Sequence, residues 1–300
     1  MINLLKLARL QFLVAGFALF VFGGLVAALL GSPFSWPRLL LGCLVVLSAQ
    51  LSVNLGNDYF DVVSDSPDGT TFISGGSGIL LKHPELRTQV KWIITALILL
   101  SLVIGIVFQQ VYSFSLWIWV FAVLGNLLGW MYSAPPFRLS QRGLGELCFT
   151  FVTGFLVPAM GYFTLRGVLD SAGLFLLFPV ICYILVFIFS VEIPDVEDDR
   201  RANKRTWVAR FGRRTGFVAI GLLLLAATGY FFLLYGIKNS LPVDFRPIAA
   251  LSLLPLLPGL WGLIRQPEDR HLATQIATLV VITLAIFLIA IDVYLFAVIF

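Results

Sequence analysis

The chain has 300 residues, of which 59% are hydrophobic and only 12% are charged, and its mean hydropathy is +0.98. Apolar runs long enough to cross a bilayer recur along the whole length, which excludes a soluble domain. In such a chain the formal net charge of +4 reports which side of the membrane the loops face, and it does not indicate binding of nucleic acid.

The apolar runs predict an all-α integral membrane protein with nine transmembrane helices. They are continuous and lack the short alternating pattern of a β-barrel, which favours helices. The first run continues through Leu30 without a small-residue cleavage site, so we interpret it as a span and not as a signal peptide. The predicted spans are 9–30, 36–58, 90–110, 114–133, 144–166, 171–192, 214–236, 247–265 and 272–298.

The charged residues predict the orientation of these spans. If the connections alternate across the membrane, 16 of the 20 Lys and Arg residues lie on the side of the N-terminus. The positive-inside rule then places the N-terminus and the long loops in the cytoplasm and the C-terminus outside. Thirteen of the 16 acidic residues lie on the same side, which the rule does not require. Both signs of charge on one face suit an anionic ligand held through metal ions.

A first acidic cluster lies at the cytoplasmic end of the second predicted span. Asn57, Asp61 and Asp65 follow one another at intervals of four residues, so on a helix they fall within an arc of about 80°. Asn54 lies inside that arc and Asp58 lies just beside it. One helix face therefore carries five oxygen ligands, and a proline and a glycine after it predict the end of the helix.

A second acidic cluster lies at the cytoplasmic end of the sixth predicted span. Glu192, Asp195 and Asp199 share an arc of about 60°, with Asp198 beside it and Glu197 pointing away. The two clusters are four spans apart, which suggests an internal duplication of about 9–133 and 144–265, followed by a ninth helix at 272–298. We expect residues 1–300 to form a single transmembrane domain.

Two matched acidic faces predict a pair of metal ions. Like charges stacked one turn apart destabilise a helix, so a cation is needed to offset the repulsion. Oxygen-only ligands favour Mg²⁺, which is commonly shared between one or two carboxylates and substrate phosphates. The alternative is that the acids are solvated loop residues paired with the basic residues Arg200, Arg201, Lys204 and Arg205.

With these residues in view, the sequence resembles the UbiA superfamily of intramembrane prenyltransferases. NDYFDVVSD (57–65) matches the family's first acidic motif and DVEDD (195–199) its second. YSAPPFRLSQRGLGE (132–146) resembles the connection after the fourth span, and DRRANKRTWVARFG (199–212) the segment after the second motif. Within the superfamily, the sequence is most similar to members that prenylate 1,4-dihydroxy-2-naphthoate in the menaquinone pathway.

The resemblance implies a helical bundle with cytoplasmic active-site loops and a lipid bilayer around it. It also implies Mg²⁺-dependent transfer of a polyprenyl group from a prenyl diphosphate to an aromatic acceptor. We expect Asn57, Asp61 and Asp65 to hold one metal ion, and Asp195 and Asp199 to hold the other. The outer ligands, or a base near the acceptor, would then be Asn54, Asp58, Glu192 and Asp198.

The residues that contact the substrates follow less directly from the sequence. Lys204 and Arg205, with Arg138 and Arg142 from the connection after span four, are candidate ligands of the diphosphate. Each base is also explained by the positive-inside rule alone. Tyr132 is a candidate for orienting the acceptor or facing a carbocation, and an interfacial tyrosine is the alternative.

Other functions remain open at this stage. The alternative acceptors are 4-hydroxybenzoate, homogentisate, a tetrapyrrole and a lipid alcohol. An ion-coupled transporter also uses intramembrane carboxylates, although such sites usually lie near the middle of the bilayer. A phosphatidyl-transfer enzyme is disfavoured, because the chain lacks that family's spacing of aspartates with an Ala-Arg pair.

Overall fold

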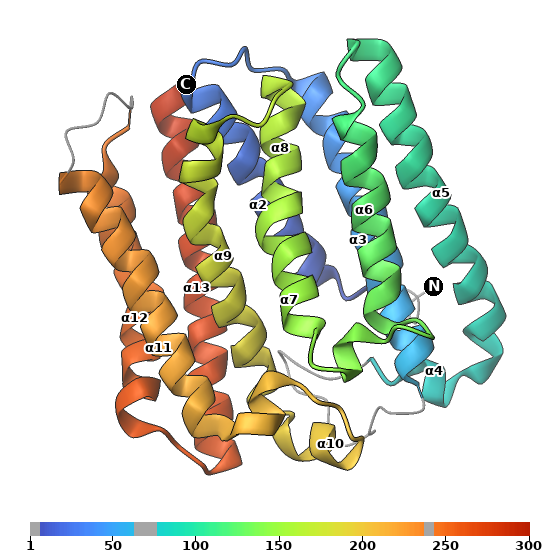
Figure 1. Ribbon diagram of the computed structural model, residues 1–300, viewed down its shortest axis with the longest axis vertical. Coiled ribbons are helices and arrows are strands. Elements are labelled where there is room, and N and C mark those ends of the chain that lie inside the picture. The colour runs from blue at the N-terminus through green and yellow to red at the C-terminus, as the bar shows by residue number, and fades with distance from the viewer. Residues whose placement is uncertain (1–6, 63–76, 237–242) are drawn as a thin grey trace.

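The structure is a computed structural model that describes residues 7–62, 77–236 and 243–300 (Figure 1). Its regular elements are all helical throughout those ranges, which confirms the predicted fold class. The first half contains α2 (Leu10–Leu29), α3 (Trp36–Asp61), α4 (Ile79–Lys82), α5 (Arg87–Tyr112) and α6 (Trp117–Ser133). The second half contains α7 (Gly145–Phe149), the π-helical segment η3 (Thr150–Leu156), α8 (Val157–Arg166), α9 (Ser171–Glu192), α10 (Val196–Arg201), α11 (Trp207–Gly236), α12 (Phe245–Arg265) and α13 (Arg270–Ile299).

Eight helical stretches in the described part of the chain are long and apolar enough to cross a membrane. One of them runs through α7, η3 and α8 as a single span, Gly145–Arg166. The fourth predicted span, 114–133, corresponds to α6, which has 17 residues and falls among the shorter apolar helices. Several helices extend beyond the predicted limits, because polar residues continue the helix past the apolar run. For example, α3 continues to Asp61 where the hydropathy pattern placed the end at 58. α11 contains a break at Gly212, whose φ is +87°, so its long apolar part begins close to the predicted start at 214.

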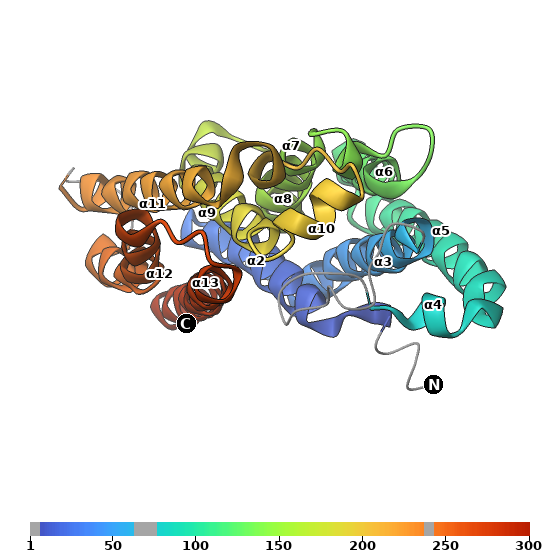
Figure 2. The ribbon, with the colours of Figure 1, turned by 90° about the horizontal axis from the view of Figure 1, so that it is seen from below.

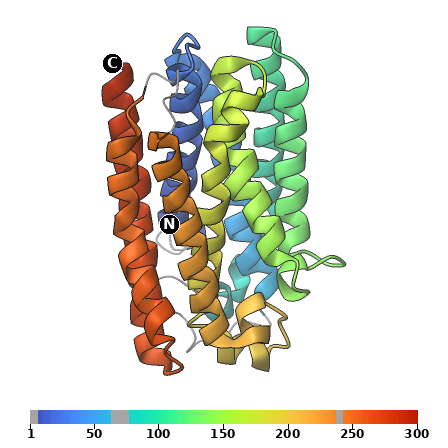
Figure 3. The same cartoon turned by 60° about the vertical axis from the view of Figure 1, so that its left-hand side comes forward.

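The long helices lie side by side in one bundle (Figure 3). α2 packs against α8, α3 against α5 and α6, and α11 against α9 and α12. The first of these contacts depends on two glycines, as is common between membrane helices. A Cβ atom on Gly23 would lie 1.8 Å from the Pro158 carbonyl oxygen, and one on Gly161 would lie 1.9 Å from the Phe20 carbonyl oxygen. The backbones of α2 and α8 therefore approach as closely as they can.

Apolar side chains cover the outside of the bundle as well as its interior. Leu233 is 66% exposed and Ile264 is 79% exposed, as expected for residues that face lipid. The polar connections are concentrated at one end, where α10 lies across the bundle between α11 and the end of α3 (Figure 2). The C-terminus lies at the opposite end (Figure 1). Both acidic clusters therefore belong to the same end of the molecule.

Candidate active site

The first acidic cluster is built on the last turns of α3. Asn57 Oδ1 accepts a hydrogen bond of 2.5 Å from the Ser133 hydroxyl at the end of α6. One turn later, Asp61 Oδ1 accepts a hydrogen bond of 3.3 Å from Gln141 Nε2 in the connection between α6 and α7. The sequence prediction that Asn57 and Asp61 share one helix face agrees with these contacts, because both side chains meet the α6–α7 region.

The flanking residues of this cluster are occupied by other contacts. The Asn54 amide donates to the Ala8 carbonyl at a distance of 3.0 Å, just before α2. Asp58 is buried, and its two carboxylate oxygens accept from the Ser77 backbone N–H at 3.2 and 3.3 Å. Asn54 and Asp58 therefore hold neighbouring segments in place. Asp65, the third member of the predicted face, lies outside the described residues.

The second acidic cluster lies on α10, directly after α9. Asp195 precedes the helix, and its carbonyl accepts a hydrogen bond of 2.8 Å from the Asp199 N–H, so these two residues are one turn apart. Asp199 is 8% exposed, and its Oδ2 accepts a hydrogen bond of 2.8 Å from the Thr206 hydroxyl. Burial raises the pKa of Asp199, and this effect is opposed by the charge of Lys204 and by the hydrogen bond from Thr206.

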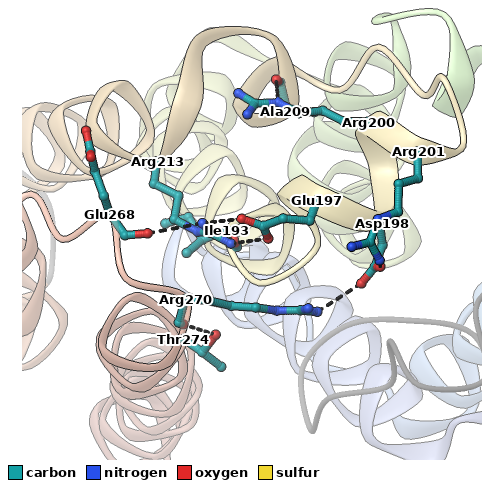
Figure 4. Close-up of polar contacts among 10 residues, drawn as sticks. All are labelled: Ile193, Glu197, Asp198, Arg200, Arg201, Ala209, Arg213, Glu268, Arg270 and Thr274. Carbon is teal, nitrogen blue, oxygen red and sulfur yellow. Dashed lines mark hydrogen bonds and ion pairs between the residues drawn. The ribbon is translucent and has the colours of Figure 1, made fainter.

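The flanking acids of α10 form ion pairs with arginines of α10, α11 and α13 (Figure 4). Glu197 makes a bidentate pair with Arg213 of α11, at 2.6 and 2.5 Å, which lowers the pKa of Glu197. Asp198 pairs with Arg270 of α13 at 2.9 Å and with Arg201 at 3.4 Å. Asp198 was predicted near the reacting groups, whereas its carboxylate here meets two arginines.

Lys204 connects the two clusters. Its charge interacts electrostatically with Asp61 of the first cluster and with Asp199 of the second. The Lys204 backbone N–H also donates to the Asp199 carbonyl at 2.8 Å. Two carboxylates from helices far apart in sequence therefore face the same ammonium group.

The other predicted bases differ in their surroundings. Arg138 interacts electrostatically with Asp61, although its side chain is exposed. Arg142 is exposed and donates to the Pro136 carbonyl at 2.7 Å within its own loop. The Arg205 side chain is exposed, while its backbone N–H donates to the Gln141 carbonyl at 3.0 Å. Lys204 and Arg138 thus both act electrostatically on Asp61, and Lys204 also acts on Asp199.

Glu192 takes part in a buried arrangement that the sequence did not predict. Glu192 Oε2 accepts from the Val208 N–H at 3.1 Å, and Glu146 Oε1 accepts from the Trp207 N–H at 2.5 Å. The two carboxyl groups are also hydrogen-bonded to each other. Glu146 was missed, although a single acid in an otherwise apolar run is a functional signal in membrane proteins. Tyr132 lies beside this pair and interacts electrostatically with both glutamates and with Asp61.

The donor set fits Mg²⁺. In the described ranges no three His, Cys, Asp or Glu residues converge on one point. An ion would therefore be held by pairs of oxygen ligands and completed by water or by a substrate phosphate, which is the usual coordination of Mg²⁺ in proteins. Asn57 with Asp61, and Asp195 with Asp199, supply two such pairs. Two acidic pairs at one end of a membrane bundle, with a lysine whose charge acts on both, suit the binding of a phosphorylated substrate.

Comparison with known proteins defines the class. The chain belongs to the UbiA prenyltransferase family, whose model matches residues 17–280. It is 25% identical over 253 residues to the homogentisate phytyltransferase of Synechocystis, a match that covers 77% of this chain and 74% of the relative. It is 20% identical over 176 residues to the 1,4-dihydroxy-2-naphthoate octaprenyltransferase of Bacillus subtilis, covering 59% and 54%.

Solved structures share the fold. A UbiA homologue from Archaeoglobus fulgidus, determined with DMAPP and Mg²⁺ bound, superposes with a TM-score of 0.67 over 99% of both chains, at 16% identity. The resemblance noted in the sequence is thus confirmed, and the protein is a membrane prenyltransferase.

Proposed function

We propose that the protein transfers a polyprenyl group from a Mg²⁺-bound prenyl diphosphate to an aromatic acceptor, of which 1,4-dihydroxy-2-naphthoate is the first candidate. The observation that carries this proposal is that the charge of Lys204 acts on both Asp61 and Asp199, which belong to different acidic clusters at the same end of the bundle. A diphosphate held between two acidic faces needs both metal ions and a fixed positive charge. The neighbour from Archaeoglobus fulgidus was determined with DMAPP and Mg²⁺ bound, which are ligands of the two kinds proposed here.

The proposed ligand sets follow the contacts. Asn57 and Asp61, with Asp65 as the third ligand predicted from the sequence, would hold one ion, and Asp195 and Asp199 would hold the other. When bound, the ions would stabilise the negative charge that develops on the diphosphate as it leaves. Among the protein's own groups, Lys204 and Arg138 would stabilise the same charge, since both already interact with Asp61.

The reaction then needs three changes at the substrates. The bond between the allylic carbon and the diphosphate oxygen breaks, and the diphosphate leaves with both electrons. The aromatic ring of the acceptor attacks the allylic cation and forms a carbon–carbon bond, after which the ring loses a proton. Tyr132, close to Asp61 and to the glutamate pair, is placed to face the cation or to orient the acceptor.

The acceptor is inferred from two observations. The motifs NDYFD and KRT and the glycine-rich stretch before α4 favour a naphthoate acceptor, as in the relative from Bacillus subtilis. The relative from Synechocystis, which acts on homogentisate, matches a longer part of the chain. Both compounds are dihydroxylated aromatic acids, so we propose a ring of this chemical class.

The membrane topology belongs to the same proposal. α6 has 17 residues, which gives a length of about 26 Å and approaches the hydrocarbon thickness of about 30 Å. We therefore propose nine spans, with the N-terminus and the active site in the cytoplasm and the C-terminus outside. Single-cysteine labelling from each side of sealed vesicles tests this, and an outward-facing α10 would contradict it.

The enzymatic experiment uses purified full-length protein with geranylgeranyl diphosphate and a panel of acceptors, with and without Mg²⁺. We expect one dihydroxylated aromatic acid to be prenylated only when Mg²⁺ is present, and this activity to be lost in Asp61→Ala and in Asp195→Ala. Activity that survives in both variants would contradict the proposal. So would an ion flux that depends on the same aspartates without any prenylated product, because this result would favour a transporter.

A further inference from the structure

The pair Glu146 and Glu192 has no place in the ligand sets proposed above. Both side chains are almost completely buried, with 6% and 7% exposed. They come from different spans, since Glu146 is in the first turn of α7 and Glu192 is the last residue of α9. A hydrogen bond joins the two carboxyl groups, which requires a shared proton because an ionised carboxylate is only an acceptor.

Both glutamates accept hydrogen bonds from the start of α11. Glu146 binds the Trp207 N–H and Glu192 the Val208 N–H, and these are the first two amides of the short helical stretch 207–211, which the non-helical Gly212 separates from the long part of α11. The first N–H groups of a helical stretch have no partner inside it, so the two carboxyl groups satisfy donors that would otherwise be unpaired. The pair therefore fixes the position at which α11 begins.

The segment fixed in this way carries the lysine that connects the two acidic clusters. Thr206, immediately before α11, donates to Asp199, and the Lys204 N–H donates to the Asp199 carbonyl. On the other side, Arg205 N–H donates to the Gln141 carbonyl, and Gln141 donates to Asp61. The stretch from 203 to 206 is thus held between Asp199 and the α6–α7 connection, and its far end is attached to the glutamate pair.

The close approach of the two stretches is visible in the backbone. Gly143 has a φ of +77°, and a Cβ atom there would lie 2.8 Å from the Arg205 carbonyl oxygen. The α6–α7 connection can therefore lie directly against the 203–206 stretch only because residue 143 is glycine. Glu146 follows three residues later and continues the same contact into α7.

We propose that Glu146 and Glu192 are positioning residues which, by holding the first amides of α11, place Lys204 where it faces both acidic clusters. This inference rests on the proposed function. Neither glutamate needs to touch the substrate for it to hold. The pair acts through hydrogen bonds that a neutral side chain can also make. Loss of the glutamate pair should weaken binding of the diphosphate more than it slows the chemical step.

The test compares Glu146→Ala with Glu146→Gln in full-length protein. The glutamine amide keeps an acceptor for Trp207 N–H and gains a donor for Glu192, so it replaces the shared proton. In Glu146→Ala we expect the KM for geranylgeranyl diphosphate to rise at least about tenfold, with a smaller change in kcat, because two buried hydrogen bonds are lost. In Glu146→Gln the KM should stay within about threefold of the wild-type value.

Hydrogen–deuterium exchange supplies a readout that does not depend on activity. Peptides covering 203–208 should exchange faster in Glu146→Ala than in the wild type, and at the wild-type rate in Glu146→Gln. Glu85→Ala is the matched control, since Glu85 is exposed and pairs only with His83 among the described residues. If Glu146→Ala cannot be purified, Glu146→Asp serves instead. Its side chain is one methylene shorter, so its carboxyl group is drawn back from the Trp207 N–H and from Glu192.

Two results would overturn the inference. Unchanged exchange and KM in Glu146→Ala would show that the pair does not hold the segment. Equal damage in Glu146→Gln and Glu146→Ala would show that the charge of the carboxylate itself is required, as for a base or a metal ligand. A wild-type protein without prenyl transfer would refute the proposed function instead, and the exchange comparison would still decide the role of the pair.

Discussion

The two acidic clusters are similar in sequence and differ in how their neighbours hold them. Around the first cluster, neutral groups of the described residues donate hydrogen bonds, among them the Ser133 hydroxyl, the Gln141 amide and the Ser77 backbone N–H. Around the second cluster, arginines bind the flanking acids, with Arg213 on Glu197 and Arg270 on Asp198. The first cluster lies at the end of a long span, whereas the second lies on a six-residue helix.

This difference shows what the extra acids of the second cluster do. A short helix at the edge of a bundle has little apolar surface to bury, so it must be attached in another way. Glu197 and Asp198 provide that attachment by pairing with α11 and α13 (Figure 4). Asp195 and Asp199 are the residues of this cluster that we propose as ligands. In this proposal, some carboxylates of the motif attach the helix and do not hold a metal ion.

The largest expected effect is a difference in kcat between variants of Asp199 and of Asp198. Asp199→Asn removes a proposed metal ligand and keeps the shape of the side chain, so kcat should fall at least about 100-fold. Asp198→Asn weakens only the pairs with Arg201 and Arg270, and we expect a loss of less than about tenfold. Steady-state kinetics at saturating Mg²⁺ measures both. A loss in Asp198→Asn equal to that in Asp199→Asn would place Asp198 among the ligands.

The next effect concerns stability and compares two adjacent arginines. Arg213 is buried and also binds the Ile193 and Glu268 carbonyls, whereas Arg214 makes an exposed pair with Glu268. Because Glu197 is partly exposed, we expect Arg213→Ala to cost about 2 kcal/mol, between the values for buried and exposed pairs. Arg214→Ala should cost at most about 0.5 kcal/mol.

Thermal unfolding of the purified variants in detergent measures this difference. The attachment of α10 would not depend on Arg213 if both variants unfolded at the same temperature. Loss of activity in Arg213→Ala at a temperature where the protein remains folded would instead place Arg213 closer to the reaction.

The smallest effect should come from the hydroxyl that holds Asn57. Ser133→Ala removes one hydrogen bond from a proposed metal ligand, which is worth about 1 kcal/mol, so the Mg²⁺ concentration for half-maximal activity should rise about fivefold. Ser140→Ala is the control, since that hydroxyl has no partner among the described residues. A dose–response curve with Mg²⁺ measures both variants, and an equal response would show that Ser133 does not orient Asn57.

The fold and the first acidic cluster were largely predictable from local sequence patterns. Apolar runs determine where spans lie, and a four-residue spacing places Asn57 and Asp61 on one face whatever the rest of the chain does. The helix limits were less predictable, because polar residues extend a helix without changing its hydropathy. Whether α6 counts as a transmembrane span also depends on its length, because 17 residues are at the lower limit for crossing a bilayer.

The partners of the second cluster were not predictable from the sequence. Whether Asp198 meets a metal or Arg270 depends on where α13 begins, which is 72 residues further along the chain. The pairing of Glu146 with Glu192 likewise depends on the packing of α7 against α9, because the two residues are distant in sequence. Helical periodicity gives the face on which a side chain lies and leaves open what lies opposite that face.

The seven-residue π-helical segment η3 has a consequence for the span that contains it. A π turn accommodates an additional residue compared with an α turn, and one residue corresponds to about 100° of rotation around a helix. η3 separates α7, which carries Glu146, from α8, which packs against α2 through Gly161. η3 therefore rotates the helix face that carries Glu146 relative to the face that packs against α2. Without this rotation, the two faces could not both point to their present partners.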